Sequence, residues 1–175
     1  MSSLLRLLLF LAAAAGLAAA EPILQLTAPG KTLALTAAEI AALPRTEITV
    51  VDPHDQKEHR YAGVAMHELL ARAGAPSGSK LTGAALQLVV LVRGRDGYTV
   101  AFALAEFDPD FSNRATVLAD QVDGMPLPEN AAPLRLIMPG DKEAARWVRK
   151  VASIDVAPLP VPAPPPAPAV APAPH

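Results

Sequence analysis

The side chains best suited to bind an anion lie in one basic stretch near the end of the chain, residues 133–151. This stretch opens with an apolar run, breaks at Pro139-Gly140, and continues into a polar loop around the single tryptophan. Because guanidinium and ammonium groups suit phosphate and other oxyanions, the loop is a candidate anion site. It contains no phosphate-binding motif, and solvated charge at a strand edge is the alternative. The anion-site hypothesis requires the basic side chains to converge, and these are Arg135, Lys142, Arg146, Arg149 and Lys150.

A second polar segment, Asp52 to Arg60, contains histidines and carboxylates of the kind that bind transition metals. It has no fixed ligand spacing, so we predict a solvated loop and assign no metal site. The carboxylates of Glu106, Asp108 and Asp110 lack the glycine and terminal glutamate of a known calcium loop. Tyr98 begins an expected strand, where its hydroxyl could orient an oxyanion or, more commonly, mark half-buried packing.

The composition excludes several classes of protein. The 175-residue chain has a formal net charge of −2 and no cysteine. The slight negative charge argues against a nucleic-acid partner, because such proteins usually have a basic surplus. Without cysteine the chain forms no disulfide and offers no thiolate to zinc, an iron–sulfur cluster or molybdenum. No serine lies in a nucleophile-elbow motif, so we do not expect a hydrolase.

Both ends of the chain differ in composition from the middle. Residues 1–20 combine one arginine, a leucine- and alanine-rich run and a final Ala-Ala-Ala, which predicts a signal peptide. The protein is then periplasmic or secreted, with no membrane attachment after cleavage; an uncleaved anchor is the alternative. Residues 157–175 are almost only proline, alanine and valine, which predicts a disordered, extended tail. Residues 21–156 have the length of one domain.

Between these ends, short apolar runs alternate with turn residues and predict an α+β domain. The predicted strands cover residues 23–26, 32–35, 46–51, 85–92, 98–103, 115–119, 133–138 and 150–156. A capping-box pattern from Thr36 to Glu39 begins one short helix, and a short helix and loop are expected within residues 104–113. The apolar face of another helix consists of Met66, Leu69, Leu70 and Ala73. We therefore expect a mixed or antiparallel β-sheet with a few short helices.

Several of these segments, in this order, resemble the molybdopterin-binding domain of the sulfite oxidase family. The similar segments are Tyr61 to Leu70, Asp96-Gly97-Tyr98, Asp123 to Leu127, Pro133-Leu134-Arg135 and Ala145 to Arg149. Each is weak alone, but their order and spacing extend the resemblance from about residue 46 to residue 156. The chain resembles the small, stand-alone, exported members of that family.

The resemblance implies a molybdopterin cofactor and a role for each matched residue. Arg135 would lie on the pterin or substrate-anion side of the pocket. The loop formed by Arg146, Trp147, Val148 and Arg149 would hold the pterin phosphate. Tyr98 would face a metal-bound oxygen, and would be catalytic only if the protein is an enzyme.

Two departures from the family pattern argue against catalysis. The family's catalytic members bind molybdenum through a cysteine in the loop that corresponds to residues 52–60, and this chain has no cysteine. A histidine that is common just before the Pro-x-Arg segment is replaced by Asn130-Ala131-Ala132. Without the thiolate, the protein has no direct influence on the electronic properties of the metal.

Three functions follow from the sequence. The preferred one is a non-catalytic, exported accessory module that binds a pterin or another small anion. The second is a molybdenum–pterin oxidoreductase with an atypical metal ligand. The third is a structural or interaction domain without a small ligand. A redox or envelope protein is the partner class expected for an exported module of this kind.

Overall fold

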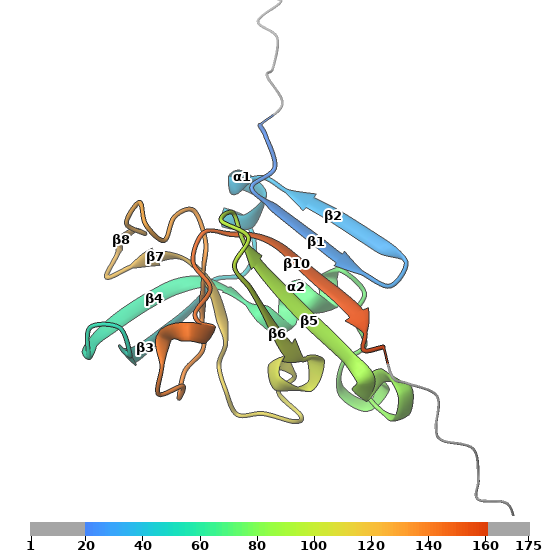
Figure 1. Ribbon diagram of the computed structural model, residues 1–175. Coiled ribbons are helices and arrows are strands. Elements are labelled where there is room, and N and C mark those ends of the chain that lie inside the picture. Colours follow the sequence, from blue (N-terminus) through green and yellow to red (C-terminus); the bar gives the residue numbers. More distant parts are fainter. Residues whose placement is uncertain (1–19, 161–175) are drawn as a thin grey trace, which may run out of the picture.

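A computed structural model describes residues 20–160, which form two β-sheets connected by short helices (Figure 1). Apart from residue 20, the predicted signal peptide lies outside the described residues, as does the predicted tail from residue 161 onward. None of the described helices is long and apolar enough to cross a membrane.

The first sheet contains both ends of the described chain. Its strands, in spatial order, are β2 (Lys31–Leu35), β1 (Leu24–Ala28), β10 (Val151–Pro158), β5 (Leu88–Gly94) and β6 (Thr99–Ala103). Strands β1 and β10 are parallel, and every other neighbouring pair is antiparallel. The predicted strands at residues 23–26 and 32–35 pair as the β1–β2 hairpin, and those at residues 85–92 and 98–103 pair as the β5–β6 hairpin.

The second sheet holds the residues that matter most for the site. Its strands are β3 (Thr46–Asp52), β4 (Lys57–Ala65), β7 (Val117–Val122) and β8 (Met125–Pro126), with β9 (Arg135–Ile137) also paired to β7. All of these pairs are antiparallel. One mixed sheet and one antiparallel sheet confirm the predicted fold class.

The helices are short and agree with the local sequence signals. The α-helices are α1 (Ala37–Ala41) and α2 (Met66–Arg72), and the 3₁₀ helices are η1 (Gly78–Lys80), η2 (Gly83–Gln87), η3 (Leu104–Phe107) and η4 (Ala144–Arg146). Thr36 and Glu39 form the predicted capping box of α1. The apolar face predicted for α2 is buried in the core.

The predicted loop over residues 52–60 is wrong, because most of it belongs to a β-hairpin. Strand β3 ends at Asp52, only four residues separate it from β4, and Asp52 pairs with Lys57 across the turn. Lys57, Glu58 and Arg60 are exposed because the hairpin extends away from the core. Polar side chains can occupy a strand that faces water, so polarity alone did not distinguish this strand from a loop.

Several other boundaries also differ from the sequence predictions. Residues 83–87 form η2 rather than the start of a strand, and β7 continues to Val122. Strand β10 runs to Pro158, two residues into the predicted tail, and the Leu159 amide then donates to the Gln87 carbonyl oxygen at 2.9 Å. Pairing with β5 explains this extension, because the backbone of a proline- and alanine-rich segment can still accept ladder hydrogen bonds.

A glycine fixes how closely β4 approaches β7. A Cβ atom added to Gly63 would lie 2.1 Å from the backbone oxygen of Leu118. The β4–β7 register also shifts between Ala62 and Gly63. This close approach sets the position of the outer half of β4, including Tyr61, relative to the rest of the sheet.

Candidate functional site

Arg135 lies at the centre of a buried polar cluster formed by three strands of the second sheet. It begins β9, its exposed fraction is 7%, and its Nη1 donates to Asp52 Oδ2 at 2.8 Å and to the Tyr61 hydroxyl at 2.9 Å. The Tyr61 hydroxyl donates to the same Asp52 oxygen at 2.6 Å. Asp52 ends β3 and Tyr61 lies in β4, so the hairpin turn positions both groups against Arg135.

The charges of this cluster depend on one another. Burial acts to raise the pKa of Asp52, but hydrogen bonds from Tyr61 and Arg135 lower it below its usual value. Burial, together with the bond to Asp52, raises the pKa of Tyr61. Asp52 is therefore an ionised carboxylate, and Tyr61 is a neutral phenol. Both accept hydrogen bonds from Arg135 and hold its guanidinium in place.

Aromatic rings surround the guanidinium on the side of the core. Arg135 Cζ lies 5.2 Å from the centroid of the Trp147 ring and 5.6 Å from that of Tyr61. The two rings meet edge to face, with centroids 6.0 Å apart. Such contacts stabilise a cation and limit its rotation. Trp147 is a buried anchor of the site.

Part of the Arg135 guanidinium has no hydrogen-bond partner. Its Nε and Nη2 atoms are buried and unpaired within residues 20–160, as is Nε1 of the neighbouring Trp147. Buried donors without partners are costly, so these nitrogens would gain from an added acceptor. Neither guanidinium nitrogen touches solvent, so an anion could reach them only after a small shift of the surrounding side chains.

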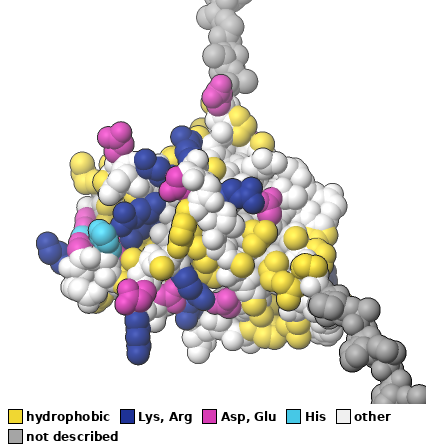
Figure 2. Space-filling view, in the orientation of Figure 1, with side chains coloured by type: hydrophobic (Ala, Val, Ile, Leu, Met, Phe, Trp, Pro, Cys, Tyr) yellow, Lys and Arg dark blue, Asp and Glu magenta, His cyan; other side chains and the backbone are white. Residues whose placement is uncertain are grey.

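A cavity of about 180 Å³ lies beside this cluster, between the β3–β4 hairpin and residues 127–131. We name it the Arg135 pocket. Its charged and histidine lining residues are Asp52, His54, Asp55, His59, Arg135 and Arg149. Asn130 also lines it. Figure 2 shows basic side chains gathered beside a histidine over the part of the surface where Figure 1 places β4, β7 and β8.

His59 is held between two carboxylates at the edge of the Arg135 pocket. Its Nε2 lies 2.9 Å from Asp55 Oδ2, and its Nδ1 lies 2.6 Å from Asp123 Oδ2. Asp123 comes from the turn between β7 and β8, so the histidine connects that turn to the β3–β4 hairpin. The hydrogen bonds to Asp123 and Asp55 raise the pKa of His59.

The sequence expectation that all the basic residues converge is only partly met. Arg135 and Arg149 line the same pocket, and Trp147 packs on Arg135. Lys142 and Lys150 line two other surface grooves instead. Val148 is buried, and its carbonyl oxygen accepts from the Leu136 amide at 2.8 Å.

Arg146 belongs to a separate ion-pair network near β6 and η3. Its Nη2 lies 2.8 Å from Glu106 Oε2, its Nε lies 3.0 Å from Asp141 Oδ2, and its Cζ lies 4.8 Å from the centroid of the Phe102 ring. Asp141 also binds Arg114 at 2.8 Å. The predicted role of Arg146 in holding a cofactor stays a prediction, but the pocket lining does not include this residue.

Tyr98 forms a hydrogen bond with the backbone of the residue that precedes Arg146. It is 50% exposed, and its hydroxyl donates to the Ala145 carbonyl oxygen at 2.7 Å. It does not line the Arg135 pocket. In the described structure its hydroxyl has a structural partner, and a catalytic role for it stays a prediction.

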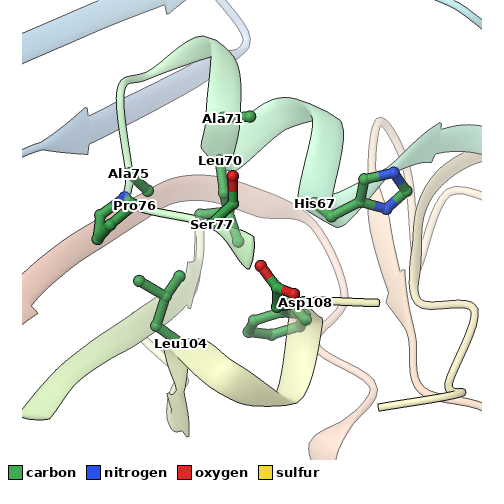
Figure 3. Close-up of a pocket in the computed structure, with 9 residues that line it drawn as sticks. His67, Leu70, Ala71, Ala75, Pro76, Ser77, Leu104 and Asp108 are labelled. Carbon is green, nitrogen blue, oxygen red and sulfur yellow. The ribbon is translucent and has the colours of Figure 1, made fainter. Parts of the chain in front are cut away.

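The small cavity in Figure 3 has no room for a ligand. It lies between α2 and η3, and His67, Ser77 and Asp108 are among its lining residues. Its volume of about 10 Å³ could hold roughly one water molecule. The Asp108 carboxylate accepts from the amides of Gly78 at 2.8 Å and Asp110 at 2.9 Å, so it organises the local backbone.

Sequence reasoning missed the two groups that fix Arg135. The polar sequence around Asp52 predicts a solvated loop, and Tyr61 is identified only as part of the segment that resembles the family. The missed signal is the alternation of His59 and Tyr61 with Glu58 and Arg60, which has the two-residue period of a strand.

The Arg135 pocket suits the anionic part of a molybdopterin better than its metal. Asp52 is one of three acidic residues in the segment where the resemblance places the family's cysteine loop, and it already accepts hydrogen bonds from Tyr61, Arg135 and the His54 amide. Among residues 20–160, no three histidine, aspartate or glutamate side chains are grouped to hold a metal ion. Pockets for cofactor-sized ligands usually measure about 300–1,000 Å³. The donor set and the volume therefore fit a small anion or a phosphate group.

The chain was compared with known families and structures. Residues 25–164 match the family model described as the oxidoreductase molybdopterin binding domain. The crystal structure of the sulfane dehydrogenase SoxCD from Paracoccus pantotrophus has the same fold, with a TM-score of 0.59 and 22% sequence identity. That match covers 76% of this chain and only 37% of the SoxCD chain. No curated protein sequence matches.

The match to the family model covers most of the chain, both sheets included, and contains every residue of the Arg135 pocket. The structural similarity independently supports the same fold. Family membership makes molybdopterin the first cofactor to test. The chain belongs to the oxidoreductase molybdopterin-binding domain family, the sulfite oxidase family that its sequence resembles.

Proposed function

We propose that this domain is an exported, non-catalytic accessory module that binds a tetrahedral oxyanion in the Arg135 pocket. The ligand is either a free oxyanion or the phosphate group of a pterin, because both offer the same charged acceptors. One observation carries the proposal: Arg135 is buried and held by Asp52 and Tyr61, while its Nε and Nη2 have no partner. An acceptor that enters the pocket and displaces the side chains covering these two nitrogens would satisfy them.

Arg149 supplies the second positive charge. It lines the pocket, and no carboxylate among residues 20–160 lies within salt-bridge distance of it. By contrast, Asp52 neutralises much of the charge of Arg135. Arg149 therefore attracts the anion, and Arg135 orients it through the donors that remain free.

The lack of a thiolate supports a non-catalytic role. The chain has no cysteine to serve as the family's sulfur ligand, and the Tyr98 hydroxyl is bound to a backbone carbonyl outside the pocket. Export is supported by the composition of residues 1–20, and a redox or envelope protein is the partner class that fits an exported module. The activity named for SoxCD is not transferred, because the match covers little more than a third of that chain.

Sulfate binding to the purified protein tests the proposal. We expect titration calorimetry to detect binding in the wild type, and Arg149→Gln to weaken it roughly tenfold or more, as for loss of one charged hydrogen bond. Arg72→Gln is the matched control, because this exposed helix residue does not line the pocket. Sulfate that does not bind, or that binds equally to both variants, overturns the proposal.

A second measurement distinguishes the two possible ligands, a free oxyanion and the phosphate group of a pterin. Protein purified from a host with an intact molybdenum-cofactor pathway is analysed for molybdenum and for pterin fluorescence. Stoichiometric pterin that is lost in Arg149→Gln identifies the phosphate group as the ligand. Stoichiometric molybdenum with turnover of any substrate contradicts the non-catalytic role.

A further inference from the structure

His59 makes two hydrogen bonds that a neutral histidine cannot donate together. Both ring nitrogens face carboxylate oxygens, at 2.9 Å from Asp55 and 2.6 Å from Asp123. A neutral imidazole has one N–H group, whereas an imidazolium has two. Carboxylates at ordinary pH only accept, so the observed geometry requires His59 to be protonated.

Both carboxylates are fixed independently of the histidine. Asp55 Oδ1 accepts from the Lys57 amide at 3.0 Å, and Asp123 Oδ1 accepts from the Arg60 amide at 2.9 Å. Asp123 also has a φ of 52°, the left-handed conformation of a tight turn. The two acceptors are therefore held in place for the proton of His59, in agreement with the raised pKa of this residue.

The environment of His59 is mostly charged. Besides Asp55 on the hairpin turn and Asp123 on the β7–β8 turn, the Tyr61 ring lies 6.1 Å from the His59 ring. The titratable or charged groups that share the pocket with His59 are Asp52, His54, Asp55, Tyr61, Arg135 and Arg149.

Loss of the His59 proton changes the charge of the pocket wall. His59 and Asp55 both line the Arg135 pocket. With the proton present, the histidine balances the Asp55 carboxylate. Without it, His59 can donate to only one of the two carboxylates, and the negative charge that Asp55 presents to the cavity is no longer balanced. This unbalanced charge opposes an incoming anion.

We propose that His59 is a positioning residue that couples oxyanion binding in the Arg135 pocket to the uptake or retention of one proton. The pocket binds an anion while His59 is protonated and hydrogen-bonded to both Asp55 and Asp123. It releases the anion when His59 loses that proton. This inference rests on the proposed anion-binding function and adds its regulation by pH.

The affinity for sulfate as a function of pH tests the coupling. Sulfate is the appropriate probe because its own charge is constant between about pH 5.5 and about pH 8.5. In the wild type we expect affinity to fall roughly tenfold across this range, as for one unit charge a few ångströms away in a partly hydrated site. His59→Gln should flatten the profile, while His67→Gln should leave it unchanged. His67 is an exposed residue of α2 that does not line the Arg135 pocket.

The outcomes separate the coupling from the binding function itself. Sulfate binding that requires Arg149 but does not vary with pH, or that varies equally in His59→Gln, overturns the coupling alone. Absence of sulfate binding at every pH overturns the proposed function as well. If His59→Gln does not fold, Asp123→Asn replaces it. That variant should shift the midpoint of the profile to lower pH, and an unshifted midpoint contradicts the coupling.

Discussion

Two arginines from the same basic stretch have opposite environments. Arg135 is buried, has one carboxylate partner and keeps donors free beside a cavity. Arg146 is partly exposed and divides its donors between Glu106 and Asp141. The sequence gives both residues the same prospect of binding an anion. The comparison shows that a guanidinium is available to a ligand only where the fold leaves its donors without protein partners.

Removing the partner of Arg135 should have the largest effect. Asp52→Asn leaves a buried guanidinium without its counter-charge, so we expect the free energy of unfolding to fall by about 3–5 kcal/mol. The matched change at the other arginine, Glu106→Gln, should cost less than about 1 kcal/mol because that pair is partly exposed. Urea denaturation of both variants measures the difference. Equal losses would remove the distinction between the two arginines.

Removal of the Tyr61 hydroxyl also tests the difference between the surroundings of Arg135 and those of Arg146. Tyr61→Phe removes one donor to Asp52 and one acceptor for Arg135 in a buried site, which should cost about 1–3 kcal/mol. Tyr98→Phe near Arg146 removes a single, exposed bond to Ala145 and should cost less. Thermal unfolding monitored by circular dichroism ranks the two. A larger loss in Tyr98→Phe contradicts the central role of the Arg135 cluster.

The pH dependence of stability should differ at the two limbs of the profile. The folded-state pKa of Asp52 is lowered, so its contribution is present above its unfolded pKa and is lost as the pH falls through the folded value. The pKa of His59 is raised, so its contribution is present below its unfolded pKa and is lost as the pH rises through the folded value. The free energy of unfolding is measured as a function of pH for the wild type and for both variants. Compared with the wild type, Asp52→Asn should show a weaker pH dependence on the acid side. His59→Gln should show a weaker pH dependence on the neutral-to-alkaline side.

Substitution of Arg146 should have the smallest effect on ligand binding. Arg146→Gln removes a charge whose donors are already engaged, so sulfate affinity should change by less than about twofold. Calorimetric titration of both Arg146→Gln and Arg149→Gln with sulfate compares the two affinities. A loss as large as that of Arg149→Gln would extend the site toward η4, as the basic stretch predicted.

Local signals in the sequence were enough to predict much of the fold. The Thr36–Glu39 capping box, the spacing of the α2 face and the turn residues of the hairpins each depend on a few neighbouring residues. The family resemblance rests on the order of such segments, and the match over residues 25–164 confirms it.

The site was harder to predict because its contacts join distant parts of the chain. Asp52 and Arg135 lie 83 residues apart in sequence, and no local pattern indicates that they pair. The same holds for His59 and Asp123, which are 64 residues apart. The β4 strand of the hairpin is harder to identify because its first four residues are all polar, so the alternation at residues 58–61 has little of the apolar contrast by which strands are identified.

The parallel pairing of β1 with β10 has a mechanical consequence. These strands lie side by side near opposite ends of the described chain, with Leu26 beside Ile154, and β10 has a neighbour on each edge. Tension between the two ends would act along the strands and load the hydrogen bonds of the ladder in shear. Such bonds must break together rather than one after another, so the domain can resist pulling at its ends.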